Sequence, residues 1–320
     1  MKNSQPYFSV CIETNNRSAT ILRTLNSVFN QSFRDFELIL FDNLSDDNTY
    51  EIISNFFNSD KFKSNPFRYL LKRADEKIHN KLECWNKPLN YASGRFIAVL
   101  EGDDEFLNDH LLLAHDILSN EENIGLYVSK NYNSISSKPE LKNSESFFID
   151  IFNIKGVAAP SQAIFIREHN GKSFRYNTKD YSYAPEIDLY LQIANFNFQA
   201  YYSDNKTIKR DIEGVPKPIK WQSSKDRFTL IKLWNSYSKK ITKSLYKKAW
   251  NNTCNITFSR YIHLRVHGLD SNLMWAVLKE EVINVDFFKY FRFLILKNFV
   301  DIFTSIKLMK IYLNLRKYFK

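Results

Sequence analysis

The sequence predicts an α/β fold with a doubly wound, largely parallel sheet, followed by a mostly helical region. In the first third of the chain, short apolar runs alternate with segments whose apolar residues recur at helical spacing. This is the pattern of consecutive strand–helix–strand units. The right-handed crossovers between the strands of such units make the sheet doubly wound. Beyond Pro216 and Pro218 the pattern is helical and basic, so we expect domains at 1–215 and 216–320.

Each expected element follows from an apolar pattern bounded by turn residues. Strands are expected at the apolar runs 7–12, 36–41, 68–71, 95–100, 125–129, 163–166 and 200–202. Helices are expected where apolar residues recur every three or four positions, at 21–29, 52–57, 82–92, 111–118 and 189–194. Ser18 is expected to cap the first helix. The polar, Ser- and Asn-rich segment 130–150 is expected to be a loop or a lid.

Polar side chains gather where the first four strands end. The loops at 13–17, 42–48 and 101–104 are polar or acidic, and the loop at 72–81 is basic. In open α/β sheets, ligands bind beyond the carboxyl ends of the strands. A basic loop that faces acidic ones is suited to a phosphate ligand carrying a metal ion.

The acidic segment Glu101–Asp104 is the clearest candidate site. Acids at the end of a buried strand cost stability unless a cation or solvent compensates them. Mg²⁺ and Mn²⁺ prefer oxygen ligands and are commonly held by one or two carboxylates plus substrate phosphates. An isolated cluster of this kind is more often a solvated acidic turn, so its context must decide between the two interpretations.

That context is a family resemblance over residues 8 to about 110. The segment SVCIETNNR resembles the "SVIIPTYNR" of family 2 glycosyltransferases. TLNSVFNQSFRDFELILFDNLSDDNT resembles their "L.S.L.Q.Y...E.I.VDDGS.D.T", and CWNKPLNYASGRFIAVLEGDD resembles their "ARN.G...A.G.YI..LD.DD". The resemblance implies the GT-A (nucleotide-diphospho-sugar transferase) fold, a doubly wound mixed sheet with a mostly helical C-terminal region here.

The resemblance also implies residue roles. Asp103 would hold Mn²⁺ or Mg²⁺ on the donor diphosphate, and Asp42 would lie at the base. Glu101 would contact the ribose or a metal-bound water. The residues expected to contact the nucleotide-sugar donor are Thr14, Asn16, Arg17, Asp42, Asn43, Lys72, Asn86 and Glu101.

Five positions depart from the family pattern. Glu13 stands in place of proline, Asn43 in place of the second aspartate of "VDDGS", and Trp85 in place of arginine. Ile78 and Asn80 replace an Asn-x-Gly. A basic contact to the nucleotide would then come from a nearby cation, namely Lys72, Arg73 or Lys77. These departures leave the nucleotide open, and UDP is the expected one.

The segment Pro185–Leu191 resembles the family's "ED.DLWLR", and Glu186 falls on the catalytic aspartate of that motif. Inverting transfer needs a base that takes the proton of the acceptor hydroxyl, and a carboxylate in a partly desolvated cleft can do this. The alternative is an acid favoured in the first turn of a helix by the helix dipole, which is the role expected for Asp188.

Residues 288–313 carry one apolar helical stripe flanked by lysine and arginine. Such a helix could lie on an anionic inner membrane surface or pack against protein, and both interpretations stay open. The net charge is +10, but no nucleic-acid-binding motif accompanies it, so nucleic acid is not an expected partner. Three scattered cysteines and the lack of a signal-like or spanning run indicate a cytoplasmic protein.

The expected function is metal-dependent, inverting transfer of a sugar from a UDP-sugar donor to a saccharide or lipid-linked acceptor in surface polysaccharide synthesis. A weakly active or inactive scaffold of the same fold is one alternative. The other is a sugar nucleotidyltransferase, which would normally carry a Gly/Arg/Lys-rich loop after its first strand, whereas 13–17 holds no glycine.

Overall fold

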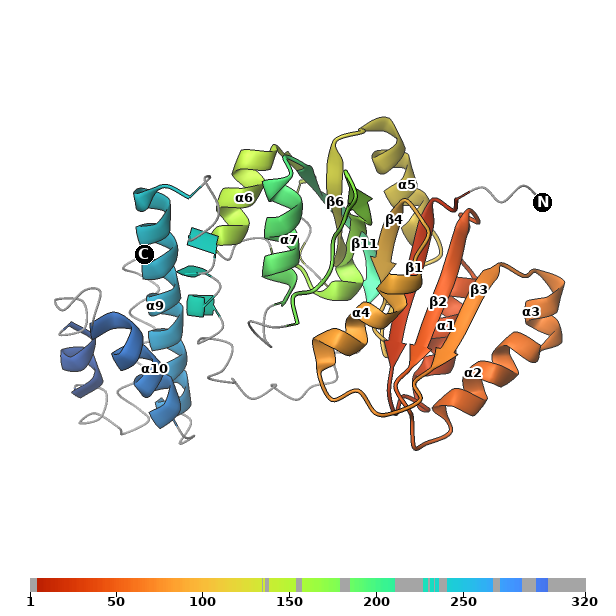
Figure 1. Cartoon of the computed structure of the whole chain (residues 1–320), viewed down its shortest axis with the longest axis horizontal. Helices are drawn as coiled ribbons and strands as arrows, with labels where there is room; N and C mark the ends of the chain where they lie inside the picture. Colours follow the sequence, from red (N-terminus) through yellow and green to blue (C-terminus); the bar gives the residue numbers. More distant parts are fainter. Residues whose placement is uncertain are drawn as a thin grey trace. The chain divides into compact units, whose positions relative to one another are not determined.

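The chain divides into two compact units (Figure 1), one formed by Met1–Lys179 with Pro185–Val215 and the other by Asp180–Ala184 with Pro216–Lys320. The computed structural model describes residues 5–133, 135, 138–153, 157–178, 185–210, 227–229, 231–232, 234–235, 241–266, 271–283 and 292–298.

The first unit is built on a mixed sheet of nine described strands. Four parallel strands lie in the order β3-β2-β1-β4, namely β1 (Phe8–Thr14), β2 (Phe36–Asp42), β3 (Arg68–Arg73) and β4 (Phe96–Val99). The antiparallel strand β8 (Ala163–Ile166) joins β4 to β6 (Ile124–Asn131). The strand β11 (Gln199–Lys209) runs parallel to β6 and pairs with β5 (Glu105–Phe106) and β7 (Glu140–Lys142). The mixed sheet implied by the family resemblance is confirmed.

Helices connect these strands as the apolar spacing predicted. The described helices of the first unit are α1 (Ile21–Phe29), α2 (Thr49–Asn58), α3 (Asp60–Ser64), α4 (Lys81–Tyr91), α5 (His110–Asn120), α6 (Ser144–Phe152) and α7 (Pro185–Asn195). A short 3-10 turn, Pro160–Gln162, precedes β8, and a small hairpin pairs β9 (Glu168–His169) with β10 (Lys172–Ser173).

The alternation of β1 assigns its side chains to two faces of the sheet. Phe8, Val10 and Ile12 are fully buried in the main core, which also contains apolar residues of α1, α2 and α5. Each such side chain contributes about 1.5–3 kcal/mol of burial free energy. The alternate residues Cys11 and Glu13 face the other side, which α4 covers. Glu13, the first polar residue after the apolar run of β1, is therefore held beneath α4.

Strand register brings the predicted polar loops together. Thr14 at the end of β1 lies opposite Asp42 at the end of β2, and Cys11 lies opposite Val99 of β4. The Asn43 amide then donates to the Thr14 carbonyl at 2.9 Å. The loops that follow β1, β2 and β4 consequently share one edge of the sheet.

Two expectations about local structure are wrong. Thr20, rather than Ser18, precedes the first residue of α1, and its side chain makes no capping bond. The Ser18 amide donates instead to Asp47 Oδ2 at 3.1 Å, which ties the loop after β1 to the loop after β2. The segment 130–150 is not simply a loop, because it contains β7 and most of α6. The apolar residues of α6 lie close to polar residues in the sequence, but in the structure they are buried, namely Phe147, Phe148, Ile151 and Phe152.

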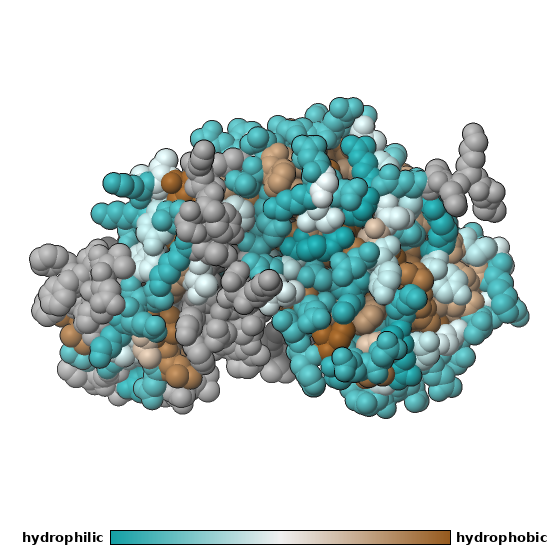
Figure 2. Space-filling model, viewed as in Figure 1, coloured by the Kyte–Doolittle hydropathy of each residue, from teal (hydrophilic) through white to brown (hydrophobic). Residues whose placement is uncertain are grey.

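The second unit is helical in its described part. Helices α9 (Lys243–Val266) and α10 (Asn272–Ile283) pack through Tyr261 and Trp275, whose rings lie 5.6 Å apart. Of the predicted apolar stripe at 288–313, only 292–298 falls within the described residues. Among the helices that the structure describes, none combines the length and apolarity needed to cross a membrane. On the face seen in Figure 2, hydrophilic side chains predominate and hydrophobic ones form smaller patches.

Candidate functional site

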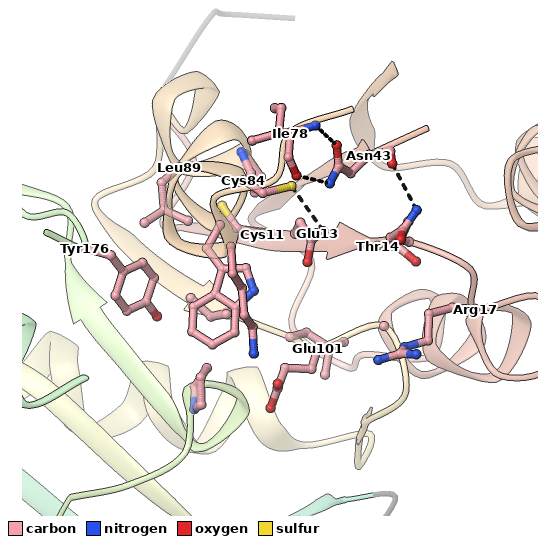
Figure 3. A pocket seen from close by; sticks show the side chains of 18 of the residues that line it. Cys11, Glu13, Thr14, Arg17, Asn43, Ile78, Cys84, Leu89, Glu101 and Tyr176 are labelled. Atoms are coloured by element: carbon pink, nitrogen blue, oxygen red, sulfur yellow. Dashed lines mark hydrogen bonds between the residues drawn. The ribbon is translucent and has the colours of Figure 1, made fainter. Parts of the chain in front are cut away.

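A cavity of about 460 Å³ opens at the carboxyl ends of β1, β2 and β4. Its wall is formed by the ends of these strands and the loops after them, the segment 77–79, residues 81–89 of α4, Pro160 and Tyr176. Figure 3 shows Glu13 and Cys84 on one side of the cavity and Glu101 on the other. The site lies at the sheet edge that the strand-end loops predicted.

At the α4 side of the cavity, side-chain hydrogen bonds fix the loops. The Cys84 thiol donates to Glu13 Oε1 at 3.2 Å. The Asn43 side chain pairs with the backbone of Ile78 in both directions, donating to its carbonyl at 3.0 Å and accepting from its amide at 2.9 Å. Asn43 thereby holds the loop after β3 against the loop after β2 (Figure 3).

On the opposite side, arginines neutralise the acidic segment. Arg17 Nη2 lies 3.4 Å from Asp103 Oδ2. Arg210, which follows β11, forms ion pairs with Glu101 at 3.7 Å and with Asp104 at 3.5 Å. Burial raises the pKa of Glu101, and the Asp104 charge raises it further, whereas the charge of Arg210 lowers it.

Helix α1 holds the backbone of the acidic segment in place. The Thr20 hydroxyl donates to the Gly102 carbonyl at 2.8 Å, and the Thr24 hydroxyl donates to the Asp104 carbonyl at 2.9 Å. A Cβ at position 102 would lie 3.1 Å from Thr14 Oγ1, so a larger residue there would require Thr14 or the segment to shift by a few tenths of an ångström. Glycine allows this close approach.

Lysines supply further positive charge to the cavity wall. Lys77 donates to the carbonyls of Asn43 at 2.9 Å and Leu44 at 3.3 Å. The Lys81 ammonium lies 4.2 Å from the ring centroid of Trp85, one helical turn further along α4. Trp85 therefore carries a cation on its ring face at the position where the family pattern has arginine.

The predicted donor contacts all lie in the described part of the chain, and they fall into two groups. Five predicted residues line the cavity, namely Thr14, Arg17, Asn43, Glu101 and Asp103. The other four, Asn16, Asp42, Lys72 and Asn86, are not among the residues that line it. Those four make contacts within the surrounding structure, and their role as donor contacts stays a prediction.

Asp42 illustrates such a supporting role. It is fully buried, and it accepts hydrogen bonds from the Ser45 hydroxyl at 2.5 Å and the Ser45 amide at 3.2 Å. It also pairs with Arg73 at 3.2 Å. These contacts stabilise the loop after β2, and they leave Asp42 beneath the cavity rather than on its wall.

The remaining three residues make contacts with neighbouring loops and side chains. Asn16 adopts a positive φ of 52° and accepts a hydrogen bond from the Asp46 amide at 2.8 Å. Asn86 donates to the Tyr176 carbonyl at 2.8 Å and accepts from the Tyr176 amide at 3.0 Å, which fixes that cavity residue to α4. Lys72 lies 5.8 Å from the ring centroid of Tyr91.

Glu186 lies in the first turn of α7 and is not among the residues that line the cavity, but the charges of cavity residues act on its carboxyl group. Burial raises the pKa of Glu186 to about 7, with its own backbone amide lowering it and the Glu101 charge raising it. The charges of Lys81 and Arg210 lower it. By contrast, Asp188 is buried and accepts from Gln192 at 2.6 Å, one turn further along the helix.

The acidic side of the cavity fits a divalent cation that shares its ligands with a diphosphate. No cluster of three or more His, Cys, Asp or Glu side chains suited to a metal occurs among the described residues. Mg²⁺ and Mn²⁺, however, are often held by one carboxylate plus substrate phosphates. Asp103 lines the cavity and is one-third exposed, so its carboxylate can supply that single protein ligand.

Sequence reasoning missed several residues that build the site. Lys81 was not identified because a lysine at the start of a helix has many ordinary roles, although its position four residues before Trp85 was a usable signal. Arg210 and Tyr176 gave no such signal, since only the folded sheet brings them to the acidic segment and to the cavity.

Comparisons with known proteins agree with this fold. Residues 9–185 match the sequence profile described as Glycosyl transferase family 2. The chain is 32% identical over 106 residues to a GalNAc(5)-diNAcBac-PP-undecaprenol beta-1,3-glucosyltransferase of Campylobacter jejuni, over 33% of this chain and 32% of that protein. It is 27% identical over 139 residues to the Escherichia coli glucosyltransferase WfgD, named for UDP-Glc and alpha-D-GlcNAc-diphosphoundecaprenol, over 43% of this chain and 47% of that protein. The chain thus aligns with less than half of each of these relatives.

Solved structures share the fold at low sequence identity. S. aureus TarS 1-349 in complex with UDP aligns with a TM-score of 0.57 and 15% identity, over 79% of this chain and 71% of that one. The Pyrobaculum calidifontis mannosyltransferase PcManGT, in complex with GDP-Man and Mn²⁺, aligns with a TM-score of 0.56 and 14% identity, over 96% of this chain and 85% of that one. At such identities the likeness establishes the architecture.

Proposed function

The chain belongs to glycosyl transferase family 2, and from this premise we propose that it transfers a sugar from a UDP-sugar donor with inversion at the anomeric carbon. The acceptor is a saccharide or a lipid-linked oligosaccharide in surface polysaccharide synthesis. The transfer depends on a divalent cation, Mn²⁺ or Mg²⁺.

The observation that carries the proposal is the environment of Glu186. A general base works best when its pKa lies near the working pH, and burial raises the pKa of this carboxyl to about 7. The charges of Glu101 and Lys81, both on the cavity wall, act on it. These electrostatic effects support a base close to the cavity that would hold the donor.

The residues divide the reaction between them. The acceptor oxygen attacks the anomeric carbon while the bond to the donor diphosphate breaks, and Glu186 takes the hydroxyl proton. Asp103 would hold the cation, which would supply positive charge to stabilise the leaving diphosphate. Lys81, whose charge also acts on Glu101 of the acidic segment, adds a second positive charge to the cavity wall.

Two relatives named above are glucosyltransferases whose names specify acceptors on undecaprenol diphosphate. We place the acceptor of this chain in the same chemical class. A lipid-linked acceptor would bring the enzyme to the cytoplasmic face of a membrane as a peripheral protein. The basic, apolar stripe at 288–313 is the segment that would make this contact.

The test measures UDP release and sugar transfer by the full chain. UDP-Glc and UDP-GlcNAc serve as donors with Mn²⁺, and GlcNAc-diphosphoundecaprenol in detergent serves as acceptor. Glu186→Gln should bind UDP normally but lose turnover, while Glu145→Gln, an exposed first-turn acid of α6, should remain active. Full turnover by Glu186→Gln would reject the base assignment. Tight UDP binding without turnover of any donor by the wild type would favour a non-catalytic scaffold.

Metal dependence has its own measurement. Calorimetry should show tighter UDP binding with Mn²⁺ than with EDTA, and Asp103→Asn should abolish that difference. Asp46→Asn, an exposed acid in the loop after β2, is the matched control. If Asp103→Asn keeps the full Mn²⁺ effect, the metal ligand lies elsewhere.

A further inference from the structure

We propose that Glu13 selects the base of the donor, its carboxylate accepting the ring N–H of uracil at the α4 side of the cavity. This assignment rests on the proposed function and deepens it. It gives a specific role to the residue that replaces proline in the family pattern.

The position of Glu13 follows from the strand that carries it. The alternation of β1 points this side chain to the face covered by α4, and Glu13 lines the cavity there. The Cys84 thiol bonds to one carboxylate oxygen at 3.2 Å and so fixes the orientation of the group. Figure 3 shows this pair on the side of the cavity away from Glu101.

The surroundings of Glu13 suit a base better than a phosphate. A carboxylate repels phosphate and needs a hydrogen-bond donor as its partner. Next to it, Cys84 belongs to a small apolar cluster with Phe41 and Ala74, against which Ile78 packs. Cys84 and Ile78 also line the cavity, and they provide an apolar surface for an aromatic ring. The arginine and aspartate side chains that suit a diphosphate and its cation lie at the acidic segment.

Nearby cations favour the hydrogen-bond-accepting form of the carboxyl group. Burial is the largest effect and leaves the pKa of Glu13 raised, although the Cys84 hydrogen bond and the charges of Lys81, Arg17 and Lys77 lower it. The Cys84 thiol donates to this carboxyl group, which therefore acts as an acceptor in the cavity. Its oxygens suit a ligand edge that presents an N–H.

Asp42, the carboxylate that sequence reasoning assigned to the base, is committed elsewhere. Both of its oxygens are bonded to Ser45, and one is also paired with Arg73. Glu13 is the carboxylate that the cavity presents on this side.

The chemistry predicts which nucleotides bind. Uracil, thymine and guanine each present a ring N–H to an acceptor, whereas cytosine and adenine present a ring nitrogen lone pair at that edge. If the ring nitrogen of cytosine or adenine faces the Glu13 carboxylate, two hydrogen-bond acceptors oppose each other. The carboxylate is then left without a hydrogen-bond donor from the base. A site built to bond an N–H therefore rejects the analogue that lacks it.

Calorimetry with UDP and CDP in the presence of Mn²⁺ tests the inference. The wild type should bind UDP about ten- to a hundredfold more tightly than CDP, the range expected for a hydrogen bond to a charged group. In Glu13→Gln, the side-chain amide can donate to cytosine, so the ratio should fall by about tenfold or more. Glu83→Gln, on the exposed face of α4, should keep the wild-type ratio.

Glu13→Asp provides a second variant, because it keeps the charge but shortens the reach by one methylene. It should weaken UDP binding without improving CDP binding, and Cys84→Ala should do the same to a smaller extent. If the wild type binds UDP and CDP equally, or if Glu13→Gln leaves the ratio unchanged, the inference is overturned. Sugar transfer in the same preparation would then leave the proposed function standing. Failure of every nucleotide to bind, together with absent transfer, would overturn both.

Discussion

The Arg210 guanidinium lies 3.7 Å from the Glu101 carboxylate and joins the end of β11 to the acidic segment after β4. The same guanidinium pairs with Asp104 at 3.5 Å. One arginine from the second half of the sheet thus neutralises two carboxylates of the first half. Its charge also lowers the pKa of Glu186, so it links the acidic segment to the proposed base.

Replacing Arg210 should therefore change the pH dependence of the reaction. In Arg210→Gln, the pKa of Glu186 should rise because a nearby positive charge is lost. The pH–rate profile should move to higher pH, and kcat/KM at pH 7 should fall by up to about tenfold, the equivalent of one pKa unit. Arg68→Gln, which removes a surface pair with Asp35, is the control. An unshifted profile in Arg210→Gln would show that Arg210 does not act on the base.

The wild-type enzyme should itself depend on pH through Glu186. A base must be ionised to take a proton, and burial raises the pKa of this carboxyl to about 7. We expect kcat/KM to rise with pH up to about 7 and then to level off. Glu186→Gln should lower the rate by about a hundredfold or more and remove this ascending limb. A profile that is flat between pH 5 and 8 would contradict the assignment.

The raised pKa of Glu186 also predicts that the free energy of unfolding falls as pH rises, whereas the rate of the reaction increases. The folded-state pKa of Glu186 is about 7 and its ordinary value is 4.5, so between these pH values the folded state binds more protons than the unfolded state. The stability contribution of this group is complete below pH 4.5 and is lost as pH rises through 7. Glu186→Gln should therefore match the wild type at pH 4 but exceed its free energy of unfolding by about 3 kcal/mol at pH 8. Denaturant unfolding at both pH values measures the difference, and equal stability at pH 8 would contradict the burial of the charge.

Lys81 should strengthen binding of the diphosphate. Its ammonium lies over Trp85 on the cavity wall, where a diphosphate can reach it. We expect Lys81→Gln to weaken UDP binding by about tenfold and to leave uridine binding unchanged, since uridine lacks phosphate. Lys72→Gln is a matched control, because Lys72 also lies over an aromatic ring but outside the cavity lining. Trp fluorescence titration measures both ligands, and equal losses for UDP and uridine would argue against a phosphate contact.

Local sequence patterns predicted the first half of the fold because the signals there are local. Each strand from β1 to β4 is a short apolar run, and each helix between them has apolar residues at helical spacing. The helix α6 was missed because its buried phenylalanines follow a polar segment. The antiparallel position of β8 between β4 and β6 depends on long-range pairing, which a local pattern does not contain.

The candidate site was predictable at its centre and not at its edges. Asp103 and Glu101 follow a strand directly, so their place at the end of the sheet could be inferred. Asp42 is the last residue of a strand, but Ser45 and Arg73 hold it beneath the cavity. Those contacts depend on the conformation of the loop that follows. Arg210 needed the register of β11, which brings a distant cation to the acidic segment.

The paired hydrogen bonds between Asn43 and Ile78 have a consequence for the kinetics of ligand binding. Together with the Lys77 bonds to the same loop, they keep one wall of the cavity in place without a ligand. The chain entropy of ordering that wall is lost during folding rather than on ligand association. Donor association should therefore be a single fast step with no slow closure of this loop, and Asn43→Ala should convert it into two kinetic phases.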